Sequence, residues 1–294
     1  MNTHKNCPIC DHNHFDVWME VADYFLTNEN FFLVKCRQCG FILTNPYPTK
    51  AEIERYYHSD EYYSHPNKRK GLISKVYEMV KLRNVKYKFR VATSGLERGR
   101  ILDIGCGSGD FLAYAKTKGW EIHGIEPNSQ AKSFSEKRLE IKLSDPDQIT
   151  AISDFTFDVI TLWHVLEHVE DLSGQLIQLK RILKPGGRLV IALPNPDAHD
   201  AKYYGKYWAA FDVPRHLYHF RFQHIRQLLN LHQFGFLKRE PLKWDAFYIS
   251  LLSERYKTGK QQLPKAIFRG LVSNVNARKS REFSSNIYLF FSGK

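Results

Sequence analysis

Short apolar runs alternate with amphipathic stretches along most of the chain after residue 99. Four apolar runs have the length of buried strands: 100–104, 121–125, 157–163 and 188–193. Between them, apolar residues at helical spacing predict helices at 110–118 and 176–183. A less clear run at 139–143 fits one more strand. This alternation predicts an α/β domain built on a largely parallel sheet. Its final part is expected to hold a helix at 222–231 and strands at 236–242 and 285–291.

The first hundred residues have a different pattern. A strand that starts at Phe41 is ended by two prolines, a short helix is expected at 51–57, and residues 65–70 look like a linker. An amphipathic helix is predicted at 72–91. The predicted domains are therefore a small module at 1–65, a linker helix at 66–98, and a main domain at 99–294.

Composition is that of an ordinary globular protein, with 43% hydrophobic and 25% charged residues among 294. Aromatic residues make up 14%, and they are densest at 56–63 and 203–222. Such clusters either line a pocket for a flat or partly apolar ligand or serve plain packing.

The formal net charge of +12 favours an anionic partner: nucleic acid, an anionic membrane surface, or a phosphorylated or carboxylated small molecule. Solubility alone is the alternative explanation. The sequence has no apolar stretch of 18 residues and no hydrophobic leader at its start. We therefore expect a cytoplasmic protein, in which the five cysteines stay reduced.

Four cysteines form two CxxC pairs separated by 25 residues. Each pair brings two sulfurs onto one edge of a tetrahedron, so two pairs complete a closed four-sulfur site. The pattern predicts a zinc-ribbon-like module with structural Zn²⁺, whose binding supplies folding energy but no catalysis. Unliganded thiols are the alternative. The predicted ligands are Cys7, Cys10, Cys36 and Cys39.

A glycine-rich turn, 105–109, follows the first strand of the main domain, and Glu126 ends the second strand. Such glycines allow close approach of a ligand to the backbone, and an acid about 20 residues further on can accept hydrogen bonds from both ribose hydroxyls. The turn reads G-x-G-x-G, and Asp103 precedes it by two residues. A carboxylate there suits an amino group better than a pyrophosphate.

The run Leu-Asp-Ile-Gly-Cys-Gly-Ser-Gly at 102–109 resembles motif I of class I S-adenosylmethionine-dependent methyltransferases, of the UbiG-like type. The "LEHV" run at 166–169 and the "LKPGG" turn at 183–187 fit the same family. The resemblance spans about residues 99–240 and implies a Rossmann-like seven-stranded sheet that binds S-adenosylmethionine. The cofactor-binding residues it implies are Asp103, Gly105, Cys106, Gly107, Gly109, Glu126, Pro127, Asp145, Trp163 and His164.

A second motif competes at the same place. His164, Glu167 and His168 match the H-x-x-E-H pattern of inverted zinc peptidases. No third ligand is evident, and the pattern lies within a complete methyltransferase frame. We therefore interpret these histidines as residues beside the cofactor, with His164 as a pocket wall.

The segment between the strand at 188–193 and the helix at 222–231 is rich in aromatics and histidines, and by resemblance it forms the acceptor pocket. His216 is the candidate catalytic base, because an imidazole can remove a proton near neutral pH. It aligns with the corresponding histidine of sugar C-methyltransferases, although Val213 replaces their tyrosine. Arg215 is a candidate for binding an acceptor anion, or it pairs with Asp212. A divalent metal held by His216 and His219 is a further alternative.

Residues 249–281 form a basic insertion, in which Ile267, Leu271 and Val275 are about one helical turn apart. A basic amphipathic helix can rest on an anionic membrane surface, or it is a solvated helical cover.

Taken together, these features predict transfer of a methyl group from S-adenosylmethionine to oxygen or carbon of a small molecule, with a glycan precursor or a lipid-linked compound as the leading acceptor. An RNA methyltransferase is one alternative, although no base-flipping motif follows the fourth strand, and nucleic acid is the less favoured partner. A non-catalytic cofactor-binding regulator, or a zinc interaction module, is the other.

Overall fold

A computed structural model describes residues 1–57 and 72–293 of the chain. The predicted linker at 65–70, and with it the predicted boundary between 65 and 66, lies outside the described residues. Within them, no helix is long and apolar enough to cross a bilayer.

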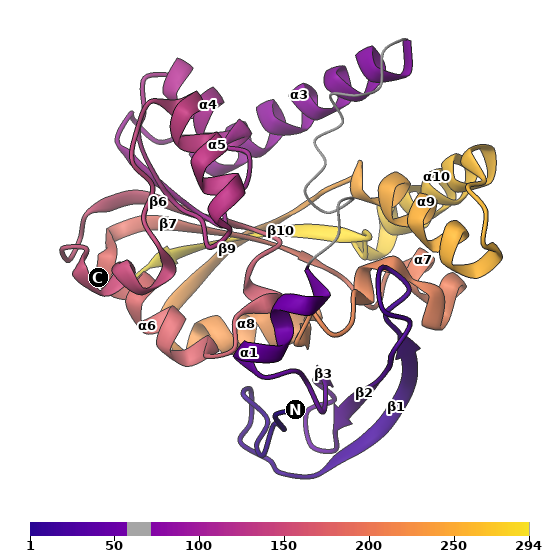
Figure 1. The fold of residues 1–294 in the computed structure, drawn as a ribbon. Coiled ribbons are helices and arrows are strands. Elements are labelled where there is room, and N and C mark those ends of the chain that lie inside the picture. The colour runs from indigo at the N-terminus through magenta and orange to yellow at the C-terminus, as the bar shows by residue number, and fades with distance from the viewer. Residues whose placement is uncertain (58–71, 294) are drawn as a thin grey trace.

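The main domain is built on a six-stranded mixed sheet in the order β5-β4-β6-β7-β10-β9. Its core strands carry near-continuous apolar runs because helices cover both faces (Figure 1). β10 is antiparallel to both of its neighbours, and the strands predicted at 236–242 and 285–291 are confirmed as the paired strands β9 and β10. The strands are β4 (Arg100–Ile104), β5 (Glu121–Ile125), β6 (Phe157–Trp163), β7 (Leu183–Pro194), β9 (Phe234–Pro241) and β10 (Ser285–Ser292).

One predicted strand does not form. Residues 139–143 were expected to add a seventh strand, but Leu139 ends a helix, and the sheet gains only a single bridge between Ile125 and Ser144. Leu139 and Leu143 are buried side chains, so the apolar run packs against the sheet region without pairing along it.

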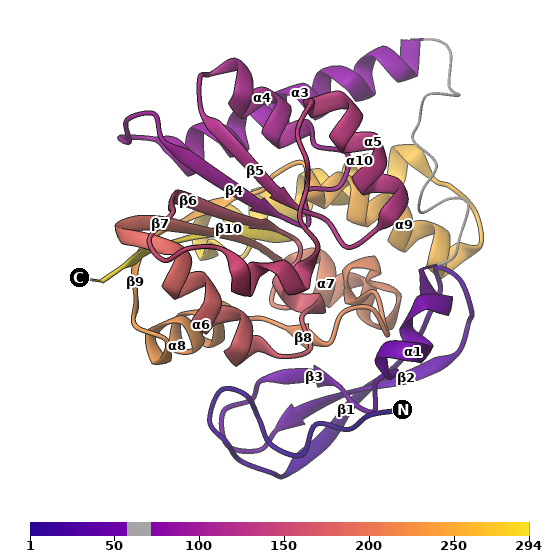
Figure 2. The ribbon, with the colours of Figure 1, turned by 60° about the vertical axis from the view of Figure 1, so that its left-hand side comes forward.

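Helices lie on both faces of the sheet, as Figures 1 and 2 show. On one face are α3 (Leu72–Thr93), α4 (Asp110–Thr117) and α5 (Ser129–Leu139). On the other are α6 (Leu172–Ile182) and α8 (Phe222–Leu231). The helices predicted at 72–91 and 222–231 are confirmed. The 3₁₀ helices η3 (Pro146–Ala151) and η4 (Leu166–His168) follow the bridge and β6.

The N-terminal module is a second sheet rather than a separate body. β1 (Phe15–Ala22), β2 (Asn30–Cys36) and β3 (Ile42–Thr44) form an antiparallel sheet, followed by α1 (Lys50–Ile53) and η1 (Glu54–Tyr56). Its fourth strand, β8 (Tyr218–His219), comes from the predicted acceptor segment and pairs with β3. Main-chain hydrogen bonds therefore connect the module to the segment that carries His216.

The acceptor segment and the basic insertion are mostly helical. Between β7 and β8 come α7 (His199–Tyr204), η5 (Gly205–Tyr207) and η6 (Ala209–Phe211). The insertion forms α9 (Asp245–Thr258) and α10 (Leu263–Ser280), which pack against each other and against α7.

Candidate active site

The glycine turn lies where β4 ends and α4 begins. Gly105, Gly107 and Gly109 have φ values of +67°, +53° and +70°, which residues with a Cβ rarely adopt. A Cβ on Gly105 would lie 2.6 Å from a methyl of Val165, whereas one on Gly107 would meet nothing within 4 Å. The turn is therefore packed on its inner side and open at Gly107, where a ligand can approach.

Glu126 supports this turn from the end of β5. Its two carboxylate oxygens accept hydrogen bonds from the N–H groups of Gly107 (2.7 Å) and Asn128 (2.9 Å). Burial raises the pKa of Glu126, and the two N–H groups oppose that rise. Each oxygen keeps a lone pair, so the side chain can still accept bonds from the two hydroxyls of a ribose.

Asp103 is a buried carboxylate at the end of β4, 2% exposed, that accepts a 2.6 Å hydrogen bond from the Thr161 hydroxyl. Burial raises its pKa to about 7, against the effect of that bond. Nearby, Trp163 has no partner for its buried indole N–H among the described residues. The glycine turn, the two carboxylates and the indole N–H of Trp163 together fit S-adenosylmethionine. The ligand would place its amino group at Asp103 and its ribose at Glu126.

Two further residues complete this region, and the sequence analysis missed both. The ammonium of Lys88, on α3, lies 4.8 Å from the centre of the Trp163 ring. Asp245, the first residue of α9, accepts a 2.9 Å hydrogen bond from Nε2 of His164. Neither belongs to a local motif, so only packing of α3 and α9 brings them to the site.

His164 follows β6 in a left-handed conformation, with φ +60°. Burial disfavours its charge, but the hydrogen bond to Asp245 and the negative charge of Glu167, 3.5 Å from Nδ1, outweigh burial and raise the pKa of His164 to about 9. His164 lies outside the short helix η4 that holds Glu167 and His168, so its ring does not share a helical face with His168. The arrangement of a peptidase zinc helix is therefore absent here.

The remaining predicted cofactor residues surround the turn. Cys106 is buried, and burial raises the pKa of its thiol. Pro127 is exposed beside Glu126. Asp145 caps η3 and pairs with Lys132 at 2.8 Å. Asp145 follows the bridge residue Ser144 in the chain, and its contact with adenine stays a prediction.

His216 faces two carboxylates. Its Nε2 lies 4.0 Å from Glu167 and 3.9 Å from Asp212, and its Nδ1–H donates a 3.0 Å bond to the carbonyl of Ala210. The ring of His168 stands against it, with centroids 4.6 Å apart. Burial and the neighbouring His216 lower the pKa of His168 to about 4, so His168 is neutral. This group adjoins the cofactor region, because Glu167 lies 3.5 Å from Nδ1 of His164.

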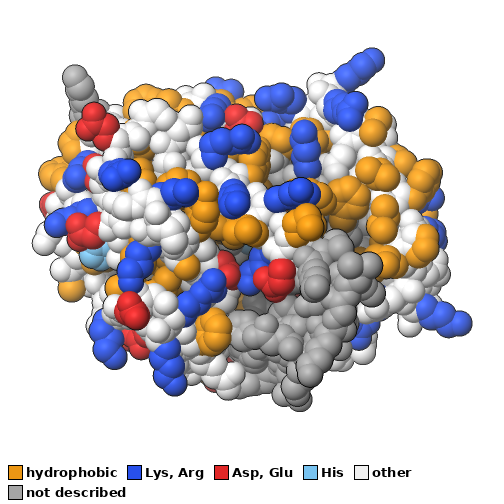
Figure 3. Space-filling view, turned by 90° about the horizontal axis from the view of Figure 1, so that it is seen from above, with side chains coloured by type: hydrophobic (Ala, Val, Ile, Leu, Met, Phe, Trp, Pro, Cys, Tyr) orange, Lys and Arg blue, Asp and Glu red, His pale blue; other side chains and the backbone are white. Residues whose placement is uncertain are grey.

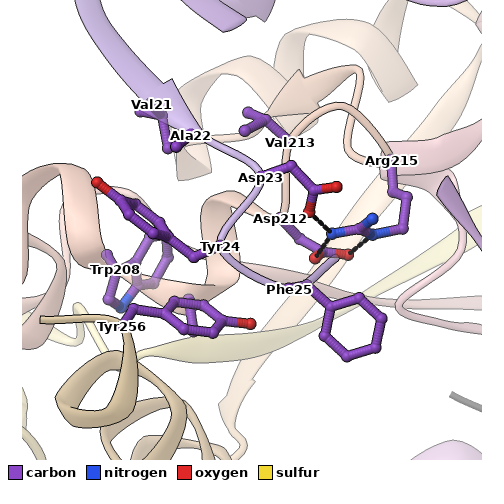
Figure 4. Close-up of a pocket in the computed structure, with 11 residues that line it drawn as sticks. Val21, Ala22, Asp23, Tyr24, Phe25, Trp208, Asp212, Val213, Arg215 and Tyr256 are labelled. Carbon is purple, nitrogen blue, oxygen red and sulfur yellow. Dashed lines mark hydrogen bonds and ion pairs between the residues drawn. The ribbon is translucent and has the colours of Figure 1, made fainter. Parts of the chain in front are cut away.

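Arg215 is placed where it cannot serve the predicted role. The side chain is 1% exposed and bonds to Asp23 (2.8 Å) and Asp212 (2.7 Å), as Figure 4 shows. A third bond goes to the carbonyl of Tyr56. With two carboxylates already at its guanidinium, Arg215 is not available to an acceptor anion. It joins the N-terminal module to the acceptor segment.

His219 is likewise committed to the contact between β8 and β3. Its Nε2 lies 3.1 Å from the hydroxyl of Thr44 on β3, which donates a 2.6 Å bond to the carbonyl of His216. Burial lowers the pKa of His219 to about 3. Among the described residues, the possible metal ligands grouped with His216 are Glu167 and His168 and not His219, so the alternative of a metal held by His216 and His219 is not supported.

The four predicted cysteine ligands converge at the tip of the module. Their sulfurs all lie within 4.8 Å of one another, with Cys7–Cys39 and Cys10–Cys36 each at 3.5 Å. Zinc–sulfur bonds of ~2.3 Å place tetrahedral sulfurs about 3.8 Å apart, so the cluster has the size of a four-thiolate zinc site. The carbonyl of Cys39 accepts a 3.0 Å bond from His224 on α8, which ties this tip to the main domain.

Comparisons with known proteins bear on the fold and on the family of this chain. Solved structures show that the fold is that of class I S-adenosylmethionine-dependent methyltransferases. A geranyl diphosphate C-methyltransferase from Streptomyces coelicolor has a TM-score of 0.54 at 15% identity, over 78% of this chain and 87% of that one. A possible histamine N-methyltransferase from Thermotoga maritima has a TM-score of 0.51 at 18% identity, over 74% and 96%.

The family follows from the sequence match. Residues 80–238 match the methyltransferase domain family, and the chain belongs to it. It is similar to a ubiquinone/menaquinone biosynthesis C-methyltransferase from Desulfotalea psychrophila, 27% identical over 40% of this chain and 50% of that protein. It is also similar to a ubiquinone biosynthesis O-methyltransferase from Alkalilimnicola ehrlichii, 30% identical over 34% and 44%. The chain thus matches half or less of these curated relatives' length. The predicted methyltransferase family and α/β fold are confirmed.

Proposed function

We propose that the protein transfers the methyl group of S-adenosylmethionine to oxygen or carbon of a small-molecule acceptor. One observation carries the proposal: the cofactor region continues directly into a group of side chains that can activate an acceptor. His164, at the end of β6, lies 3.5 Å from Glu167, which lies 4.0 Å from Nε2 of His216. An acceptor held at His216 would therefore be one side chain away from the end of β6, where the family presents the methyl group.

The chemistry asked of the protein is limited. The sulfonium is already a good leaving group, so the site must align the acceptor and lower the pKa of its hydroxyl or carbon acid. His164 carries positive charge at neutral pH and lies between the two halves of the site. The relatives named above as O- and C-methyltransferases favour an oxygen or carbon acceptor over nitrogen.

A lipid-linked acceptor is favoured by the surface of α10. Five apolar side chains on this helix are exposed by 44% or more: Leu263, Ile267, Phe268, Leu271 and Val275. Four of them recur every fourth residue, so they form one row along the helix. We define this row with Phe268 as the α10 apolar face.

Positive charge surrounds the α10 apolar face. The helix contains no acidic residue, and exposed cations lie at both of its ends: Lys257, Lys260, Arg278, Lys279 and Arg281. Figure 3 shows hydrophobic side chains gathered at the end of the molecule where Figure 1 places α9 and α10, with Lys and Arg side chains around them. An apolar row between cations matches an anionic membrane surface, where the protein would meet a lipid-linked acceptor.

We also propose that the cysteine cluster binds structural Zn²⁺. Four sulfurs leave no open coordination position, so this ion would hold the module and through it β8, and would take no part in methyl transfer.

The test is incubation of the protein with methyl-labelled S-adenosylmethionine and a cell extract, followed by separation of small molecules and lipids from polymers. Label in the low-mass or lipid fraction supports the proposal and starts identification of the product. The Asp103→Asn variant is the control and should transfer little label. Label in RNase-sensitive polymer contradicts the small-molecule acceptor, and no binding of S-adenosylhomocysteine contradicts catalysis.

A further inference from the structure

A second cluster of metal-type ligands lies beside the cofactor region, apart from the cysteines. Glu167, His168 and His216 each offer one ligand atom, and these atoms lie within 4.8 Å of one another. They come from η4 and from the segment before β8, which the fold brings together: the Leu217 N–H donates a 2.8 Å bond to the Glu167 carbonyl. We propose that these three side chains bind a divalent first-row metal ion.

The state of Glu167 is the first argument. The side chain is fully buried, and neither carboxylate oxygen accepts a hydrogen bond from the described residues. The nearest cationic atom, Nδ1 of His164 at 3.5 Å, balances charge but leaves both oxygens without a hydrogen bond. Buried carboxylates without partners are costly, and metal coordination is one of the few arrangements that satisfies them.

The orientation of the two histidines is the second argument. Nδ1 of His216 lies 3.0 Å from the carbonyl of Ala210, and Nδ1 of His168 lies 3.0 Å from the carbonyl of Arg215 and 3.1 Å from the hydroxyl of Tyr57. A neutral ring that donates from Nδ1–H to such a carbonyl carries its lone pair on Nε2, and Nε2 is the nitrogen of His216 that lies 4.0 Å from Glu167. A backbone carbonyl on the far nitrogen is the usual support of a metal-bound imidazole, because it fixes both tautomer and ring orientation.

Two imidazole nitrogens and one carboxylate oxygen select the kind of ion. This ligand set suits Zn²⁺, Mn²⁺ or Fe²⁺ better than Mg²⁺ or Ca²⁺, which prefer oxygen. Bonds of ~2.1 Å would place tetrahedral donors about 3.4 Å apart, so Glu167 and His216, now 4.0 Å apart, need to approach by roughly 0.6 Å. Three protein ligands leave at least one position for water or acceptor oxygen.

The consequence for methyl transfer rests on the proposed function. An acceptor hydroxyl bound to the ion loses its proton to water more readily, its oxygen attacks the methyl carbon, and the carbon–sulfur bond breaks with its electron pair kept by sulfur. In this arrangement Nε2 of His216 is a ligand and does not remove the proton itself. Ligation thus replaces the role of free base predicted from the sequence.

The experiment is a titration of the full-length protein, with its cysteine centre loaded with zinc, by Mn²⁺ observed by electron paramagnetic resonance. Mn²⁺ is chosen because it prefers nitrogen and oxygen to thiolate. The Glu167→Gln, His168→Gln and His216→Gln variants should each bind Mn²⁺ at least ~10-fold more weakly than wild type. His232→Gln, a histidine at the end of α8, is the matched control and should bind as wild type does.

Unchanged Mn²⁺ affinity in the three variants, or no saturable binding by wild type, overturns the proposal. Wild-type protein gives a second readout that no folding defect of a variant affects. Electron spin echo modulation of bound Mn²⁺ should show two coordinated imidazole nitrogens. Absence of these nitrogens would also overturn the proposal. Calorimetry with S-adenosylhomocysteine runs in parallel. A protein that binds Mn²⁺ at this site but not the cofactor product would contradict the proposed function and leave the metal site standing.

Discussion

The guanidinium of Arg215 donates a 2.8 Å hydrogen bond to the carboxylate of Asp23, and both side chains are about 1% exposed or less. Asp23 belongs to the turn after β1, and Arg215 precedes β8, so the pair joins the N-terminal module to the acceptor segment (Figure 4). Phe25 covers the guanidinium, with its ring centre 4.9 Å away. The module and the acceptor site should therefore lose stability together.

Asp23→Asn is expected to lower the free energy of unfolding by about 3 kcal/mol, because breaking a buried ion pair leaves the remaining charge poorly compensated. Asp212 still pairs with Arg215 in this variant, so the loss of stability should be at the lower end of the range for broken buried ion pairs. Urea unfolding followed by circular dichroism measures it. Asp16→Asn breaks the exposed pair with Arg37 and should leave the midpoint unchanged. Equal midpoints for the two variants would contradict this role of Arg215.

Binding of the cofactor should depend on pH through Asp103, whose pKa burial raises to about 7. The amino group of the ligand pairs only with the ionised carboxylate, so affinity should be full well above pH 7. It should fall as pH drops through 7, by up to ~10-fold per pH unit. Calorimetry with S-adenosylhomocysteine from pH 5.5 to 8.5 measures this. Asp103→Asn should bind weakly with a flat profile; a wild-type profile that is also flat would remove Asp103 from amino-group recognition.

Loss of the cysteine centre should disturb the acceptor site as well as the module. Cys36→Ser removes one of the four proposed zinc ligands, at the end of β2. The pairing of β2 with β3, and that of Leu43 on β3 with Tyr218 on β8, should then loosen. Zinc content by mass spectrometry and amide exchange at β8 measure the two effects. Cys106→Ser, buried but outside the cluster, should retain the metal. Rapid exchange confined to β1–β3, with β8 still protected, would show that the module does not support the acceptor segment.

Much of the main domain could be predicted from the sequence because its signals are local. The strand and helix alternation is a short-range pattern, and Asp103, the glycine turn and Glu126 all lie within 24 residues of the sequence. The run at 139–143 was misassigned because buried apolar residues occur equally at the end of a packed helix. Leu139 ends α5, close to Gly109.

The residues that were missed depend on long-range packing. Lys88 is one of several lysines on α3, and Asp245 begins a helix 81 residues after His164. Arg215 could pair with Asp212 by local spacing, but nothing in the sequence indicates Asp23, 192 residues away, as its second partner. The two-residue strand β8 is likewise too short to give a pattern, and only β3 makes it a strand.

The α10 apolar face should bind anionic membranes, because its exposed row lies between cations and carries no acidic residue. Wild-type protein is expected to co-sediment with vesicles containing phosphatidylserine, less so in high salt, and only weakly with neutral vesicles. Ile267→Ser with Leu271→Ser should abolish most of this binding, because both side chains are about half exposed and their loss leaves the core intact. Ile177→Ser, an equally exposed residue on α6, is the control. If wild-type protein does not bind the vesicles but sediments as a dimer, and the double variant sediments as a monomer, the α10 apolar face is an interface with a second copy of the chain. The proposal of a membrane-bound acceptor then loses its main support.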